Sequence, residues 1–95
     1  MINVTATITA KRDKVDDVLN ALKFVKSETE KEVGCYEYKI HQLADDATQI
    51  FFYERWESLE HLNKHAVSKH FTDFAAQADA LLDKSFEIKI YKEVL

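Results

Sequence analysis

Residues 36–56 read YEYKIHQLADDATQIFFYERW, and this stretch decides the fold. Large apolar and polar side chains alternate over residues 36–43, and a period of two is typical of half-buried β-strands. Residues 48–56 predict another strand, rich in large apolar side chains. Asp45 and Asp46 mark a short turn-like loop between the two segments. Two strands this close in sequence predict an antiparallel hairpin.

The segment before the hairpin has the pattern of a helix. Apolar residues recur at helical spacing between residues 15 and 25 and form one buried stripe. Asp13 is a good N-cap for this helix. Gly34 is the only glycine, and it suits the left-handed conformation in which many helices stop.

The segment after the hairpin predicts a second helix, capped by Ser58. Its apolar stripe begins at Leu59 and is interrupted near residues 67–68, where Ser68 can act as a second cap. The stripe then resumes from Phe71 to Leu82. We therefore expect a helix with a break in its middle.

Residues 2–10 and 85–92 alternate again and predict the two outer strands. The order becomes β-α-β-β-α-β, the α+β arrangement of the ferredoxin-like fold, with both helices on one face of an antiparallel sheet. The third strand carries large groups on both faces: Phe52 and Trp56 on one, Phe51 and Tyr53 on the other. Because the helices cover only one face, the large groups on the other face need a second surface against them. This predicts a homodimer, a dimeric α/β barrel formed by two antiparallel sheets.

Composition narrows the class of protein. The chain has 95 residues, a net charge of −4 and one cysteine, so we expect one domain over 1–95 and no intrachain disulfide. Its lysines are interleaved with acidic residues, which excludes the clustered basic face of a nucleic-acid-binding protein. Without a signal-peptide pattern or a membrane-length apolar run, we expect a cytoplasmic protein with no membrane partner.

Two further stretches carry a resemblance to a known family. They are EVGCYEYKIHQ at 32–42 and YERWESLEHLNKHAVSKHF at 53–71. The second is similar to a strand-to-helix signature of the antibiotic-biosynthesis-monooxygenase family. The resemblance implies a cofactor-free oxygenase that uses dioxygen on a small electron-rich aromatic, such as a quinol or a phenol. No cofactor is expected, and the substrate supplies the electrons.

His65 is the first catalytic candidate, because it lies at the margin of the buried stripe and imidazole accepts a proton near neutral pH. The resemblance places the family's helix histidine at the same position. Glu54 is the second candidate, since a carboxylate between Phe52 and Trp56 on a strand is unusual. It would orient His65, bind a substrate hydroxyl, or form a salt bridge. A packed, non-catalytic histidine is the alternative for His65.

Four aromatic residues are candidates for binding the substrate. Trp56 offers a flat face for stacking, Phe71 a wall of the pocket, and Tyr38 a hydroxyl for a quinol oxygen. Phe52 shares the face of Trp56. Each of these side chains is also well suited to the core, and Tyr38, which shares a predicted face with Tyr36, to cross-strand packing.

A metal site is not expected. Glu57, His61 and His65 lie one helical turn apart, but the HExxH pattern is absent and the first two look like surface positions. His70 is expected at the solvent or at the rim of a dimer. Relatives that bind haem have a histidine in the later part of the second helix, and residues 72–78 contain none.

Two alternatives to the oxygenase stay open. The first is an isomerase of a small phosphorylated metabolite, in which the same acid and base would shuttle a proton. It needs a cationic phosphate ligand, for which Lys64, Arg55 and Lys39 are the candidates. The second is a non-catalytic, small-molecule-binding dimer.

Overall fold

A computed structural model describes the whole chain, from Met1 to Leu95. One antiparallel sheet has the strand order β2-β3-β1-β4. Its strands are β1 (Ile2–Ala10), β2 (Cys35–Leu43), β3 (Asp46–Trp56) and β4 (Leu82–Tyr91). The ferredoxin-like order is confirmed, with β1 and β3 paired in the centre.

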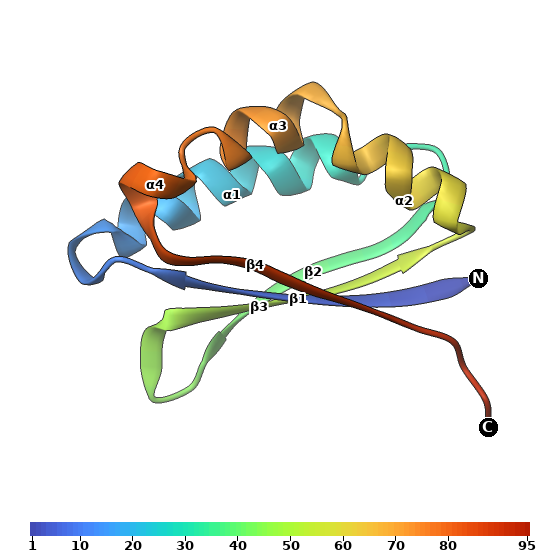
Figure 1. Ribbon diagram of the computed structural model, residues 1–95, viewed down its shortest axis with the longest axis horizontal. Coiled ribbons are helices and arrows are strands. Elements are labelled where there is room, and N and C mark those ends of the chain that lie inside the picture. The colour runs from blue at the N-terminus through green and yellow to red at the C-terminus, as the bar shows by residue number, and fades with distance from the viewer.

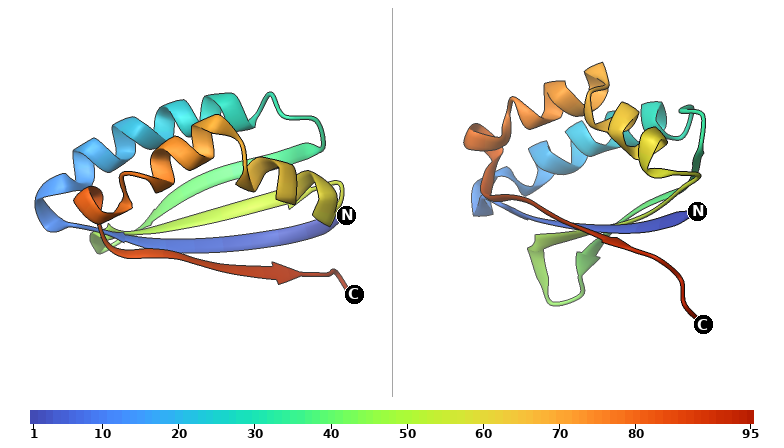
Figure 2. Two further views of the ribbon diagram at one scale, coloured as in Figure 1. Left: turned by 45° about the horizontal axis from the view of Figure 1, so that its top comes forward. Right: turned by 45° about the vertical axis from the view of Figure 1, so that its right-hand side comes forward.

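All helices lie on one face of the sheet (Figures 1 and 2). The long helix α1 (Val15–Thr29) is followed, after the hairpin, by α2 (Leu59–Ala66), α3 (Lys69–Ala75) and the single turn α4 (Ala78–Leu81). Figure 2 shows α1 lying beside the consecutive helices α2, α3 and α4, over the strands. The opposite face of the sheet carries no helix. None of the helices has the length and apolar character required to cross a membrane.

The core lies between the helices and the inward face of the sheet. Strand alternation sends Val4, Ala6 and Ile8 inward from β1, where they are 1–2% exposed, and α1 covers them with Val18, Leu22 and Val25. Phe52 and Trp56 of β3 are 0% exposed. The predicted stripe of α1 and the predicted faces of β1 and β3 are confirmed.

The break in the second helix is also confirmed. The Ser58 side chain accepts a hydrogen bond from the backbone N–H of His61, and Ser68 accepts one from that of Phe71. These two caps start α2 and α3 separately, so the chain changes direction between them. Residues 59–75 therefore form two short helices.

Three local predictions were wrong. Asp13 does not cap α1, because a 3₁₀ turn (Arg12–Lys14) precedes the helix and no side chain caps it. Tyr36 does not share the environment of Tyr38, because the pairing register shifts between Cys35 and Glu37. Tyr38 is 3% exposed, whereas Tyr36 is 53% exposed and donates to Glu57. β4 begins at Leu82 rather than at residue 85.

Candidate active site

His65 is buried at the end of α2 and is enclosed by other rings. It is 3% exposed, and the centroids of Trp56, Phe71 and Tyr38 lie 5.0, 5.1 and 5.5 Å from its own. This packing leaves the imidazole little freedom to rotate. Two of the three rings come from the sheet and one from α3, so the site depends on the break after α2.

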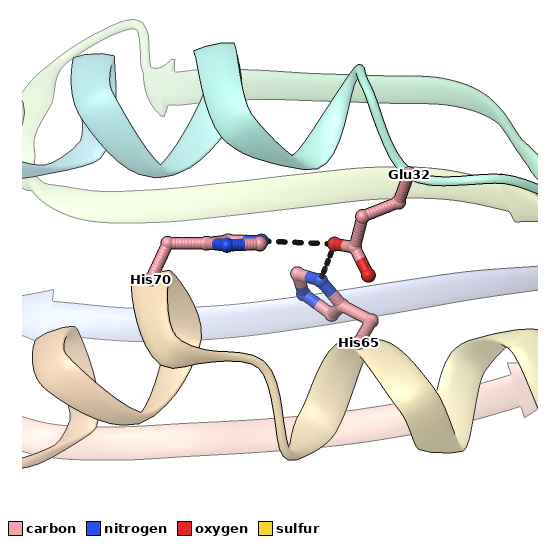
Figure 3. Close-up of side chains that lie close together, drawn as sticks. All are labelled: Glu32, His65 and His70. Atoms are coloured by element: carbon pink, nitrogen blue, oxygen red, sulfur yellow. Dashed lines mark hydrogen bonds and ion pairs between the residues drawn. The ribbon is translucent and has the colours of Figure 1, made fainter.

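The atom that fixes the orientation of His65 is a carboxylate oxygen of Glu32, in the connection between α1 and β2. Nδ1 of His65 lies 2.6 Å from Oε2 of Glu32, and Nε2 of His70 lies 2.9 Å from the same oxygen. Figure 3 shows both rings directed at this oxygen. An ionised carboxylate can only accept, so Nδ1 of His65 carries a proton and Nε2 keeps its lone pair.

The Glu32 contact corrects two expectations. The carboxylate that bonds His65 is Glu32 and not Glu54, and His70 is not at the solvent, since its side chain is 14% exposed. Glu32 was missed as a site residue, although it opens the stretch 32–42 that carries the family resemblance. That motif was the only signal in the sequence, because Glu32 and His65 are 33 positions apart.

A cavity of about 190 Å³ lies between α2, α3 and the sheet. His65 and Glu54 both line it, and Asn63 is the third polar residue on its wall. The remaining walls are apolar: Val4, Ala6, Leu62, Ala66, Phe71, Phe86 and Ile88. Nε2 of His65 is buried and has no hydrogen-bond partner within the protein. The cavity is therefore mostly apolar, and one of its lining residues is a histidine with an unpartnered ring nitrogen.

Glu54 lies in an otherwise apolar row across the sheet. Its cross-strand partners are Tyr38 in β2 and Val4 in β1, and it is 5% exposed. Oε1 accepts a hydrogen bond of 2.9 Å from Nε1 of Trp56. Burial raises the pKa of Glu54 to about 7, and the bond from Trp56 opposes that rise. A substantial share of Glu54 is thus protonated at neutral pH.

Burial acts on His65 in the opposite sense. It lowers the pKa of the imidazole, and the hydrogen bond with Glu32 only partly offsets this effect. Although His65 lies beside a carboxylate, the loss of hydration dominates, so the ring is neutral near pH 7. The cavity contains a neutral imidazole and a carboxyl group that can be protonated, which together can accept and donate a proton.

The four aromatic candidates are divided between the cavity and the core. Phe71 lines the cavity, but Trp56, Tyr38 and Phe52 do not. Trp56 and Tyr38 pack against His65, and Phe52 packs against Tyr38 and Phe86. A ligand in the cavity would contact Phe71 and Phe86 rather than these three. Burial raises the pKa of the Tyr38 phenol well above its ordinary value.

The other sequence candidates lie outside the cavity. His61, in the first turn of α2, contacts Ser58 and Glu57, which precede the helix, and it is not part of the group of possible metal ligands around His65. Lys64 pairs with Glu60 on the exposed side of α2. Arg55 and Lys39 are absent from the cavity walls, so no cationic side chain is available there for a phosphate.

The fold and the cavity define a class: a ferredoxin-like α+β protein with a histidine and a glutamate lining a small, mostly apolar pocket. The sequence profile of the antibiotic biosynthesis monooxygenase family matches residues 1–77, and the chain belongs to this family. The match ends before α4 and β4, which complete the fold.

Curated relatives are similar at the sequence level and are uncharacterised. A Synechocystis protein is 29% identical over 91 residues, which is 96% of this chain and 62% of that protein. The Bacillus subtilis protein YjcS is 29% identical over 75 residues, 78% of this chain and 71% of its own. The chain thus spans about two thirds of the length of these relatives.

Solved structures share the fold over nearly the whole chain. A conserved protein from Methanosarcina mazei is 32% identical, with a TM-score of 0.91 over 98% of this chain and 92% of that one. A protein from Pseudomonas aeruginosa is 26% identical, with a TM-score of 0.91 over 99% and 94%. An antibiotic biosynthesis monooxygenase has a TM-score of 0.94 over both full chains at 23% identity, and this likeness concerns the fold alone.

Proposed function

We propose that this protein is a cofactor-independent monooxygenase that oxidises a small aromatic quinol or phenol with dioxygen. The observation that carries the proposal is His65, which lines an apolar cavity and whose buried Nε2 has no hydrogen-bond partner. Glu32 holds the tautomer in which this nitrogen can accept a proton. Family membership supports the reaction class.

The proposed step begins when Nε2 of His65 takes the proton of a substrate hydroxyl. The resulting phenolate gives an electron to dioxygen much more readily than the phenol does. A carbon–oxygen bond then forms on the ring and the oxygen–oxygen bond breaks. One oxygen atom stays in the quinone product, and the other leaves as water with two hydrogens of the substrate. The substrate supplies all four electrons that reduce the two atoms of dioxygen, and the proton held by His65 is one of the two that leave in water.

Glu54 and the cavity walls fit this substrate class. A protonated Glu54 can donate a hydrogen bond to a substrate oxygen, and Phe71 and Phe86 offer ring faces for an aromatic ligand. The volume of about 190 Å³ is below the range of roughly 300–1,000 Å³ that is usual for drug-sized ligands. The substrate is therefore small. An isomerase of a phosphorylated metabolite is less well supported, since the cavity has no cationic side chain.

We further infer that two copies pair through the helix-free face of the sheet and form a dimeric barrel. Phe51 and Tyr91 are 39% and 49% exposed there, and a depression of about 430 Å³ near the hairpin is lined by His41, Leu43 and Phe51 among others. This depression is larger than the His65 cavity but contains no oriented base. Apolar groups on an uncovered face favour a partner surface.

Oxygen uptake with reduced benzoquinol and naphthoquinol tests the proposed reaction. We expect uptake above the autoxidation rate for the wild type and a loss of that excess in His65→Ala. Glu32→Gln should retain the fold but lose at least roughly tenfold in kcat, since it weakens the orientation of the base. Uptake at the no-protein rate for the wild type would remove quinol oxidation from consideration.

A further inference from the structure

Glu32, His65 and His70 also have the composition and spacing of a metal site. Their ligand atoms, Oε2, Nδ1 and Nε2, all lie within 4.8 Å of one another (Figure 3). Two imidazoles and one carboxylate are donors that zinc and neighbouring divalent transition metals accept. We propose that these three side chains bind one such ion, with Zn²⁺ as the representative case.

The present geometry is close to the one that an ion needs. With metal–ligand bonds of about 2.1 Å, tetrahedral coordination puts ligand atoms roughly 3.4 Å apart. Oε2 of Glu32 is now 2.6 and 2.9 Å from the two nitrogens, so the carboxylate has to withdraw by less than about 1 Å. Its side chain is 18% exposed and belongs to the connection between α1 and β2, outside any helix. Rotation of this side chain can supply the shift.

The two histidines are held ready for coordination. His65 ends α2 and is enclosed by aromatic rings, while His70 lies in the first turn of α3, across the helix break. Oγ of Ser68 lies 3.2 Å from Nε2 of His70 and donates to the backbone oxygen of His65 at 2.7 Å. Because these nitrogens already converge, little side-chain freedom is lost when an ion binds.

Occupancy would change the hydrogen bonding of His65, and this consequence rests on the proposed function. A neutral imidazole has one ring proton, which is now on Nδ1. If the ion takes Nδ1, that proton moves to Nε2, and no proton is gained or lost by the ring. Nε2, the nitrogen that acts as the base in the proposed function, then carries a proton and cannot accept one. The ion would thus act as a reversible inhibitor of the proposed base.

Metal titration of the full chain, freed of metal by a chelator and without substrate, tests the site. Cobalt(II) reports its coordination through visible absorption, and calorimetry measures zinc binding. We expect one equivalent to bind the wild type and at least roughly tenfold weaker binding in His70→Asn and in Glu32→Gln. His61→Asn is the matched control, because His61 lies on the same helix as His65 but pairs with Glu57, which is outside the proposed site. Circular dichroism verifies the fold of each variant.

Three results would overturn the site: no saturable binding by the wild type, unchanged affinity in both folded site variants, or loss of binding in His61→Asn. Oxygen uptake with and without zinc then separates this proposal from the proposed function. Metal binding without any quinol oxidation would leave the metal site standing and remove the oxygenase. Quinol oxidation that saturating zinc does not slow would refute the tautomer argument.

Discussion

Two glutamates in this protein show how surroundings decide what a carboxyl group can do. The Glu32 side chain is 18% exposed, and one of its carboxylate oxygens contacts the imidazoles of both His65 and His70. Glu54 lies 5% exposed among apolar neighbours, with one donor, Nε1 of Trp56. The first is suited to orient a base. Glu54 can be protonated near neutral pH, and its raised pKa can be measured through the pH dependence of stability.

Replacement of Glu54 by glutamine should stabilise the protein at alkaline pH. The pKa of Glu54 rises from 4.5 to about 7 on folding, so the folded state binds the proton more tightly. Stability from this group is fully present below pH 4.5 and is lost as the pH rises through 7. Since one pKa unit is about 1.4 kcal/mol, we expect Glu54→Gln to gain up to ~3 kcal/mol at pH 8.5 relative to pH 4.5.

Urea unfolding at fixed protein concentration, repeated across this pH range, measures the difference between variant and wild type. Glutamine keeps an acceptor for Trp56, so the hydrogen bond does not confound the comparison. Glu60→Gln is the control, because the Glu60 side chain is 77% exposed and its replacement should give a flat difference. A flat difference for Glu54→Gln as well would mean that folding does not raise the pKa of Glu54.

The candidate site was only partly predictable at the level of residues. His65 and Glu54 were found because one lies on the edge of a helical stripe and the other interrupts an apolar strand face. Both are local signals. Glu32 contacts His65 from the connection between α1 and β2, which also contains Gly34, whose φ is 86° and whose added Cβ would collide with the His61 ring. Such a contact between distant segments has no periodicity to reveal it.

At the level of elements, the break between α2 and α3 is what brings His65 and His70 to one oxygen. Ser58 and Ser68 cap the two helices, and each hydroxyl also contacts a histidine: His61 at 2.7 Å and His70 at 3.2 Å. They differ in that only Ser68 belongs to the network around Glu32. Replacement of each serine in turn therefore distinguishes an effect on helix stability from an effect on the geometry of the site.

We expect Ser58→Ala and Ser68→Ala each to lower the free energy of unfolding by about 1 kcal/mol, the usual cost of a lost N-cap. NMR of the histidine ring protons should distinguish them. Ser68→Ala is expected to shift the resonances of His65 and His70, and Ser58→Ala mainly that of His61. Equal shifts of His65 in both variants would contradict a specific contribution of the second cap to the site.

The elements themselves were predicted well wherever the signal was local. Alternation and runs of large apolar side chains predicted the four strands, and Ser58 and Ser68 predicted the helix break. Asp13 failed as a cap because a 3₁₀ turn takes up residues 12–14 first. The faces of Tyr36 and Tyr38 were misassigned because alternation assumes a regular ladder, and the register shift between Cys35 and Glu37 interrupts it.

At the level of the whole molecule, the helices leave much apolar surface uncovered. Phe51 and Tyr91 lie exposed on the helix-free face, and Ile88 and Ile90 of the edge strand β4 are 52% and 51% exposed. An open β-strand edge also has free backbone donors and acceptors. Uncovered apolar surface and an open strand edge destabilise an isolated chain of this size, and the proposed dimer would cover part of them.

A charge on the helix-free face should therefore disrupt the proposed dimer. Phe51→Asp would place a carboxylate against the sheet of the second copy, where desolvation makes it costly. We expect light scattering after gel filtration to give twice the chain mass for the wild type and the monomer mass for Phe51→Asp. Phe24→Asp makes the same chemical change on α1, where Phe24 is 61% exposed, and should leave the dimer intact. Dissociation of both variants would point to general destabilisation, and a dimeric Phe51→Asp would place the interface elsewhere, with the uncovered edge of β4 as the next surface to test.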